Sequence, residues 1–151
     1  VPRVGGFEGG TVTWAPTNIT YGHNNRSAQF RLPQNRYCIE NRAADMTMNV
    51  YLAFSMTLAA AVEGIKMKIH PGKPTDQDLY EMTDKEFKKL GIKRLPRNLL
   101  MALEALKNDK LSDEVIGTVM KNSLLAYKND EWERYHQAVT DWEVKEYLRL
   151  Y

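Results

Sequence analysis

Four charged side chains in the first third of the chain have the types and spacing that anion chemistry needs. Arg26 and Arg31 lie five positions apart, and Glu40 and Arg42 follow with one residue between them. In a β-strand, residues two positions apart project from the same face with Cα atoms about 6.5–7 Å apart. Glu40 and Arg42 would then present an acceptor and a guanidinium fork side by side. These residues predict a site for carboxylate or phosphate groups.

The same spacing has a simpler interpretation. Arg31 and Glu40 could form an ordinary ion pair across two strands, on a solvated face of a sheet. In the functional interpretation, the carboxylate holds a divalent metal ion and the arginines grip phosphate and carboxylate groups of substrates. Spacing alone leaves both interpretations open.

The type of basic residue divides the chain more sharply than net charge does. Residues 1–60 contain five Arg and no Lys, whereas residues 61–151 contain twelve Lys and four Arg. Arg suits bidentate recognition of anions, and Lys is a flexible, well-hydrated charge. With 21 basic and 19 acidic residues, the net charge of +2 argues against a nucleic-acid-binding protein. Anion chemistry is therefore expected before residue 60.

The elements that must position these residues read as strands between about 11 and 42. Residues 11–14 are rich in β-formers, 15–18 resemble a turn, and an extended pattern resumes at 19–21 and breaks at 22–25. Ser27–Leu32 and Tyr37–Arg42 alternate with a period of two, and Pro33 separates them. These two segments predict a hairpin, which would bring Arg31 and Glu40 together.

Helices are expected from about 48 to 150. The apolar stretch from Met48 to about Lys68 is long enough for a mostly buried helix. The prolines and glycine of 70–74 predict a loop. Thr83 and Glu86 have the spacing of a capping box, which predicts a short helix that ends near Gly91.

Three apolar patterns predict the remaining helices. Leu99, Leu100, Leu103 and Leu106 define one helical face, and a second helix starting at Ser112 would carry Val115, Ile116, Val119 and Met120. Trp132, Tyr135, Val139 and Trp142 recur at helical spacing, which is typical of core packing in a last helix.

Composition and length limit the remaining possibilities. The 151 residues suit one domain, and the longest apolar run, residues 50–62, is too short to cross a bilayer, so no membrane association is expected. A single cysteine, Cys38, favours a reducing compartment, and we expect a cytoplasmic location. His23, His70 and His136 lack ligand spacing and are expected in loops or on the surface. The N-terminus resembles a cut end because it has neither Met nor a signal sequence.

Several short motifs, taken in order, resemble the glutamine synthetase family. They are Asn-Asn-Arg-Ser-Ala (24–28), Phe-Arg-Leu-Pro (30–33), Ile-Glu-Asn-Arg (39–42), Ala-Asp (44–45), Asn-Val-Tyr-Leu (49–52), Glu-Gly-Ile-Lys (63–66), Lys-Ile-His-Pro-Gly (68–72), Asp-Leu-Tyr (78–80) and Leu-Pro-Arg-Asn-Leu-Leu-Met-Ala-Leu (95–103). Almost all of the chain, 1–151, is similar to the C-terminal portion of the family's catalytic domain. The implied fold is α+β: antiparallel strands of a split barrel followed by helices, without the family's N-terminal β-grasp domain.

The resemblance implies an ATP-dependent ligase that phosphorylates the side-chain carboxylate of glutamate and then lets ammonia or another amine displace phosphate. By this similarity Arg26 and Arg31 contact ATP and its phosphates, and Arg26 is catalytic. Arg36 is assigned to the same phosphates, Glu40 to a Mg²⁺ or Mn²⁺ ion, and Arg42 to the carboxylate of glutamate.

Two further positions are matched by the resemblance. Glu8, in Phe-Glu-Gly, resembles the family's flexible-loop glutamate, which shields the intermediate and helps to deprotonate the attacking ammonium. Tyr80 lies where some bacterial members carry an adenylylated tyrosine, but a surface tyrosine is common and no modification is predicted.

The resemblance also leaves the family's other metal ligands and nucleotide-facing strands upstream of Val1. The chain is therefore expected to be inactive alone and to need the missing N-terminal portion of the same enzyme. The resemblance also implies that the intact enzyme forms a ring-shaped homo-oligomer. Residues 11–18 look more like γ-glutamylmethylamide-type synthetases, so methylamine or a polyamine could replace ammonia. The other alternative is a non-catalytic assembly module derived from this fold.

Overall fold

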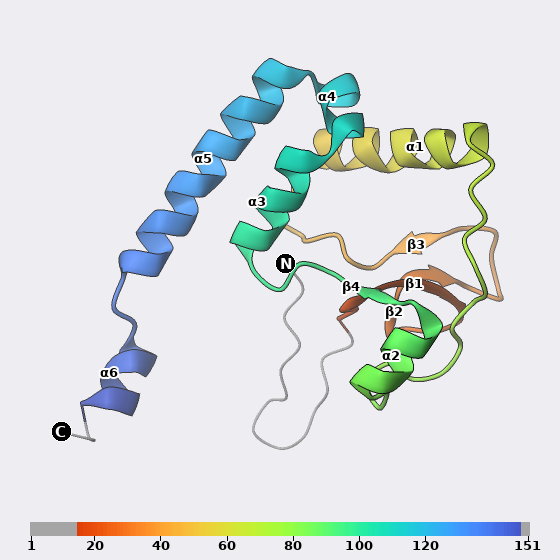
Figure 1. Cartoon of the computed structure of the whole chain (residues 1–151), viewed down its shortest axis with the longest axis horizontal. Coiled ribbons are helices and arrows are strands. Elements are labelled where there is room, and N and C mark those ends of the chain that lie inside the picture. The colour runs from red at the N-terminus through yellow and green to blue at the C-terminus, as the bar shows by residue number, and fades with distance from the viewer. Residues whose placement is uncertain (1–14, 149–151) are drawn as a thin grey trace. The chain divides into compact units, whose positions relative to one another are not determined.

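The structure, a computed structural model, describes residues 15–148 as two compact units, one that ends at Asn98 and one that starts at Leu99. The first unit contains a small sheet and two helices, and the second contains only helices (Figure 1). The predicted strand at 11–14 and the candidate Glu8 lie outside the described residues. This mixture of a small sheet and several helices is the α+β class that the sequence predicts.

The sheet of the first unit has four strands in the order β3-β2-β1-β4. Their bounds are β1 Asn18–His23, β2 Ala28–Leu32, β3 Glu40–Asn41 and β4 Lys93–Arg94. β2 and β3 are antiparallel, as expected. β4 also pairs antiparallel with β1, so the expectation that residues 48–150 contain only helices is wrong at residues 93–94, where two residues add to the edge of the sheet. β1 and β2 are parallel, which differs from the expected antiparallel strands. Parallel neighbours usually need a much longer connection than residues 24–27, so the alternating pattern alone predicts an antiparallel pair.

The predicted hairpin is present but shorter than expected. Arg31 lies directly opposite Glu40, and Phe30 opposite Asn41. The backbone N–H of Arg42 donates to the carbonyl of Gln29 at 2.8 Å, which continues the pairing by one step. Residues 34–36 form the predicted connection, but residues 37–39 of the predicted second strand are not in the sheet, which starts again only at Glu40.

A small core supports the sheet and the second helix. Ala28, Leu79 and Phe87 form a buried cluster, and the partly buried Met82 and Ile92 pack against it. Phe87 comes from α2 (Asp84–Leu90), so this short helix is fixed by its only buried residue. The predicted capping box is confirmed, because the Thr83 side chain accepts from the Glu86 backbone and the Glu86 side chain accepts from that of Thr83. Gly91 then ends the helix in the left-handed conformation at φ +66°, which glycine adopts without strain.

Helix α1 (Val50–Lys66) lies within the predicted 48–68 range, but the expectation that it is mostly buried is wrong for the described chain. None of its residues is buried, and Phe54 and Ile65 are 72% and 78% exposed. Asn49 caps its start by accepting from the backbone N–H groups of Tyr51 and Leu52. An apolar composition makes this segment helical, but burial also requires a facing element, and among residues 15–148 none packs closely enough to bury a residue of α1.

The second unit consists of α3 (Leu99–Asn108), α4 (Lys110–Ile116), α5 (Thr118–Gln137) and α6 (Asp141–Tyr147). Asp109 caps α4, so this helix starts two residues earlier than predicted from Ser112. The expected continuation of that helix to Met120 is wrong because Gly117, at φ +78°, separates α4 from α5. Within the predicted leucine face of α3, Leu103 is buried and Leu100 is exposed.

The aromatic stripe, formed by Trp132, Tyr135, Val139 and Trp142, was predicted to pack in a core, but it is not buried among the described residues. Residues 138–140 divide it between α5 and α6, and Tyr135, Val139 and Trp142 are each more than 60% exposed. Trp132 stacks on His136 with ring centroids 5.4 Å apart. The periodicity identified apolar helix faces correctly, but the described residues do not provide the surface that would cover them.

Candidate functional site

The cross-strand pair at the centre of the candidate site is formed by Arg31 and Glu40. The directly opposed positions on β2 and β3 bring Arg31 Nη1 to 2.9 Å from Glu40 Oε2. Both side chains are largely shielded, with 16% and 21% exposed. The hydrogen bond from Arg31 is the largest cause of a lowered pKa at Glu40. The ion pair of the simpler interpretation is thus present.

Two further side chains complete this cluster. Arg36, from the turn before β3, donates to Glu40 Oε1, so each carboxylate oxygen has its own guanidinium. Arg31 Nη2 donates to the side-chain oxygen of Asn24, which has a left-handed backbone at φ +52°. Asn is one of the few residues other than glycine that adopt this conformation readily. Asn24 and Glu40 therefore hold the Arg31 guanidinium from two sides.

A hydrogen bond from the Arg42 side chain to the Arg26 backbone brings these two arginines together. Arg26 is exposed in the connection between β1 and β2, and its side chain makes no polar contact with another described residue. Arg42 follows β3, and its Nε donates to the backbone carbonyl of Arg26 at 3.1 Å. One guanidinium thus stays available for a ligand, and the other is anchored to the backbone beside it.

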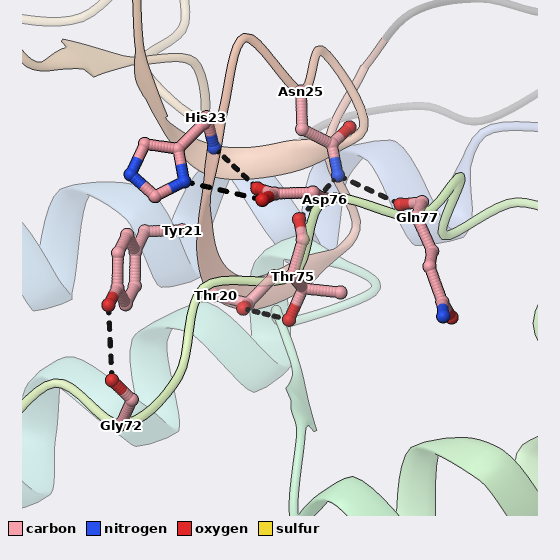
Figure 2. A network of polar contacts seen from close by, with 8 residues as sticks. All are labelled: Thr20, Tyr21, His23, Asn25, Gly72, Thr75, Asp76 and Gln77. Atoms are coloured by element: carbon pink, nitrogen blue, oxygen red, sulfur yellow. Dashed lines mark hydrogen bonds and ion pairs between the residues drawn. The ribbon is translucent and has the colours of Figure 1, made fainter.

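Residues 72–77, which we call the strap, cross the first strand (Figure 2). The backbone N–H of Thr75 donates to the carbonyl of Tyr21 at 2.8 Å, and the Thr75 and Thr20 hydroxyl oxygens lie 3.0 Å apart. The Tyr21 hydroxyl donates to the carbonyl of Gly72 at 3.1 Å. These contacts join segments about 50 residues apart in sequence, and sequence reasoning missed them.

Asp76 of the strap binds His23 through both carboxylate oxygens. Oδ1 accepts from the His23 backbone N–H at 2.6 Å, and Oδ2 lies 3.3 Å from His23 Nδ1 (Figure 2). The backbone hydrogen bond is the main cause of a lowered pKa at Asp76. His23 is therefore a structural partner of the strap.

Asn25, which directly precedes Arg26, binds both the strap and Ser27, the residue that follows Arg26. Its side-chain Nδ2 donates to the carbonyls of Thr75 at 2.7 Å and Gln77 at 2.9 Å. Its Oδ1 accepts from the backbone N–H and the hydroxyl of Ser27, at 2.9 and 2.7 Å. The Ser27 hydroxyl in turn accepts from the backbone N–H of the buried Leu79 at 3.0 Å. The Asn-Asn-Arg-Ser string (24–27) does not reveal these partners, because Thr75 and Gln77 lie about 50 residues further along the chain.

The other predicted residues lie apart from this cluster or cannot be placed. Glu8 lies outside the described residues. Tyr80 is half-buried, its hydroxyl donates to the carbonyl of Ala15, and burial raises its pKa. His70 accepts from the backbone of Gly72, and His136 stacks on Trp132.

Within residues 15–148, no group of three or more His, Cys, Asp or Glu side chains could hold a metal ion. Among those residues, no helix is long and apolar enough to cross a membrane.

Fold and site together define an α+β chain with a cluster of arginines around Glu40. The family model for the glutamine synthetase catalytic domain matches residues 10–147. The chain therefore belongs to the glutamine synthetase family, as the resemblance predicted.

Relatives within this family carry two names, glutamine synthetase and glutamate–methylamine ligase. The glutamine synthetase of Methanococcus maripaludis is 38% identical over 139 residues, which cover 90% of this chain and 31% of that protein. The glutamate–methylamine ligase of Methyloversatilis universalis is 40% identical over 140 residues, covering 93% of this chain and 31% of the relative. The chain thus spans about a third of the length of these curated relatives.

A solved structure supports the same fold. The structure described as GmaS/ADP complex, conformation 1, matches with a TM-score of 0.80 at 34% identity. The match covers 92% of this chain and 32% of the other.

Proposed function

We propose that this chain is the C-terminal part of the catalytic domain of an ATP-dependent ligase that joins glutamate to ammonia or a small amine through a γ-glutamyl phosphate. The observation that carries the proposal is the gathering of four arginines around Glu40 and the Arg26 backbone, in a chain of the glutamine synthetase family. Carboxylate and phosphate groups are the ligands that such guanidinium forks recognise.

The proposed roles of the side chains are those that the resemblance to the family implies. Arg26, exposed and without a polar partner among the described residues, contacts the phosphate that is transferred and stabilises its charge. Arg31 and Arg36 bind ATP phosphates, and Arg42 binds the carboxylate of glutamate. Phosphoryl transfer depends on positioned positive charge more than on covalent chemistry, which suits a site built from arginines. Glu8 is proposed to shield the intermediate and help to deprotonate the attacking ammonium.

The described residues do not by themselves fit a divalent metal ion. Glu40 is one carboxylate, both of its oxygens are bound to arginines, and no group of three potential ligands exists in residues 15–148. A Mg²⁺ or Mn²⁺ ion usually needs several oxygen ligands. Glu40 is therefore proposed as one ligand of a metal site that other parts of the enzyme complete.

The chain alone is proposed to be inactive, because half of a site cannot surround both ATP and glutamate. Its partner is the remainder of the family's polypeptide, which the chain's 31% coverage of its relatives leaves out. The assembled enzyme is proposed to be a ring-shaped homo-oligomer. The exposed apolar face of α1 supports an assembly role and keeps open a non-catalytic module as the alternative.

The amine is a separate question. Methylamine is a specific alternative to ammonia, because the relative from Methyloversatilis universalis is named a glutamate–methylamine ligase. A polyamine is the other alternative amine substrate. A comparison of ammonia, methylamine and putrescine as substrates of the assembled enzyme would decide among them.

Complementation tests the proposed function. The chain is mixed or fused with the upstream polypeptide of the Methyloversatilis relative, and ADP formation is measured with and without glutamate and an amine. The proposal predicts activity that requires both substrates and falls by about a hundredfold in Arg42→Ala, because glutamate loses its guanidinium partner. Arg134→Ala is the matched control, since Arg134 pairs on α5 with the exposed Asp130. Self-assembly without any complemented activity would favour the module instead.

A further inference from the structure

The side chain of Asn25 uses its complete hydrogen-bonding capacity to fix the connection that carries Arg26. Its two N–H groups reach the carbonyls of Thr75 and Gln77, and its oxygen accepts twice from Ser27. Figure 2 shows the two donor contacts to the strap. An amide has two donors and one oxygen with two lone pairs, so no other uncharged side chain of this size replaces all four bonds.

The surroundings of Asn25 hold these partners at fixed positions. A Cβ atom on Gly22 would lie 2.2 Å from the carbonyl oxygen of Thr75, so the strap approaches β1 as closely as a glycine permits. Ser27 is 1% exposed, and its hydroxyl is tied to Leu79 of the core. The amide of Asn25 therefore meets a rigid arrangement of acceptors and donors.

Arg26 lies between Asn25 and Ser27, and its carbonyl receives Arg42 Nε. A shift in this connection would move the Arg26 backbone and, through its carbonyl, the Arg42 guanidinium. We propose that Asn25 is a positioning residue that sets the two arginines for the substrates, with the strap as its support. This inference rests on the function proposed above, because it assigns Arg26 and Arg42 to substrate binding.

The first experiment uses the 151-residue chain itself and does not depend on activity. Asn25→Asp keeps the size and the oxygen acceptors but replaces two donors with a carboxylate that faces two carbonyls. Asn25→Ala is the second variant, in case the aspartate prevents folding. Tyr21→Phe is the matched control, because it removes another side-chain bond to the strap, to Gly72, and leaves the Arg26 connection intact.

Nitrogen-15 NMR of arginine side chains reports the Arg42 Nε–H to Arg26 hydrogen bond. We expect this proton to exchange with water at least about tenfold faster in Asn25→Asp and to stay as in the wild type in Tyr21→Phe, because weakening a hydrogen bond by about 1.4 kcal/mol changes its opening equilibrium tenfold. The backbone amides of α2 serve as the fold control. Unchanged exchange at Arg42 in both Asn25 variants, with α2 intact, would overturn the proposal.

The second experiment uses the complemented ligase. Asn25→Asp should lower kcat/KM for glutamate by about tenfold to a hundredfold, since small misplacements of substrate-binding groups have effects of this size. The KM for the amine should stay within about twofold of the wild type, since neither arginine contacts it, and this split distinguishes positioning from general unfolding.

The two experiments separate the possible failures. If the wild-type complex forms no ADP, the proposed function fails, and the NMR result still decides whether Asn25 positions Arg42. If the complex is active and Asn25→Asp resembles Tyr21→Phe in kcat/KM for glutamate, the positioning role is wrong.

Discussion

The strap-bound sheet and the C-terminal helices are held by different kinds of contact. In the sheet region, side chains such as Asn25 bind backbone groups about 50 residues away, around a small core of Ala28, Leu79 and Phe87. In the helical unit, the described contacts are mostly local, and large apolar side chains such as Val119 and Trp142 are exposed. The contrast indicates that the site region contains its own structural support, whereas the described residues of the helical unit leave large apolar side chains exposed.

The substitution with the largest expected effect prevents the close approach of the strap to β1. In Gly22→Ala, the new Cβ would lie 2.2 Å from the Thr75 carbonyl oxygen, so the strap must move. We expect a loss of about 2–3 kcal/mol in the free energy of unfolding, measured by urea denaturation.

Gly64→Ala makes the same substitution at a glycine that no other segment approaches. Gly64 lies inside α1 with no atom near the position of a Cβ, so alanine should stabilise this helix by about 0.5–1 kcal/mol. Equal destabilisation by both substitutions would show that the strap contact does not limit residue size at Gly22.

The next effect addresses the polar centre of the helical unit. Lys121 is 3% exposed and its Nζ donates to the carbonyl of Asp109 at 2.7 Å and to Asp113 at 2.9 Å. Lys121→Ala should lose about 2 kcal/mol, because a shielded carbonyl and a carboxylate lose their partner. Hydrogen exchange of the α4 amides measures the loss. Lys128→Ala, which removes the more exposed pair with Glu131, should change stability by at most about 0.5 kcal/mol, and a larger loss there would contradict this ranking.

The two capping boxes compare the regions directly. Thr83 starts α2, which buries Phe87, and Thr140 starts α6, which has no buried residue. Thr83→Ala should lower the stability of the sheet region by about 1 kcal/mol, because loss of the cap is transmitted through Phe87. Thr140→Ala should increase only the exchange of the α6 amides. A global loss of stability in Thr140→Ala would show that α6 packs in a way the described contacts do not include.

The smallest effect concerns the carboxylate at the centre of the site. Arg31 is the main cause of the lowered pKa at Glu40, followed among the charged partners by Arg36. Arg31→Gln should therefore raise that pKa more than Arg36→Gln, as measured by carbon-13 NMR titration of the Glu40 carboxyl. Because the folded-state pKa is lowered, the stabilisation by Glu40 exists above the pKa of the unfolded chain and is lost as pH falls through the folded value. An unchanged titration in Arg31→Gln would mean that the ion pair does not form in solution.

Local features of this protein are predictable because they depend on fixed spacing. The capping box at Thr83 and Glu86 needs only three residues of separation, and the hairpin register that opposes Arg31 to Glu40 follows from two alternating segments and a turn. The motifs that resemble the glutamine synthetase family are short strings of the same kind, and the family is confirmed.

Other features were misjudged where a local pattern competes with long-range geometry. An alternating pattern does not specify the direction of a neighbouring strand, so the parallel pairing of β1 and β2 was missed. An apolar helix pattern does not reveal whether a partner is present, so α1 and the aromatic stripe were expected to be buried. The break at Gly117 depended on one positive φ angle within an apolar periodicity that otherwise continued.

The sequence by itself determined the capping box at Thr83, the arginine-rich first part and the membership of the family, since each depends on residues close together in the chain. Only the tertiary structure decided that the strap lies across β1 and that Asn25 binds Thr75 and Gln77. The physical reason is that a contact between residues 50 positions apart requires closure of a long loop, whose geometry depends on all the packing between them. The support of the candidate site is therefore a property of the folded chain, although its arginines are visible in the sequence.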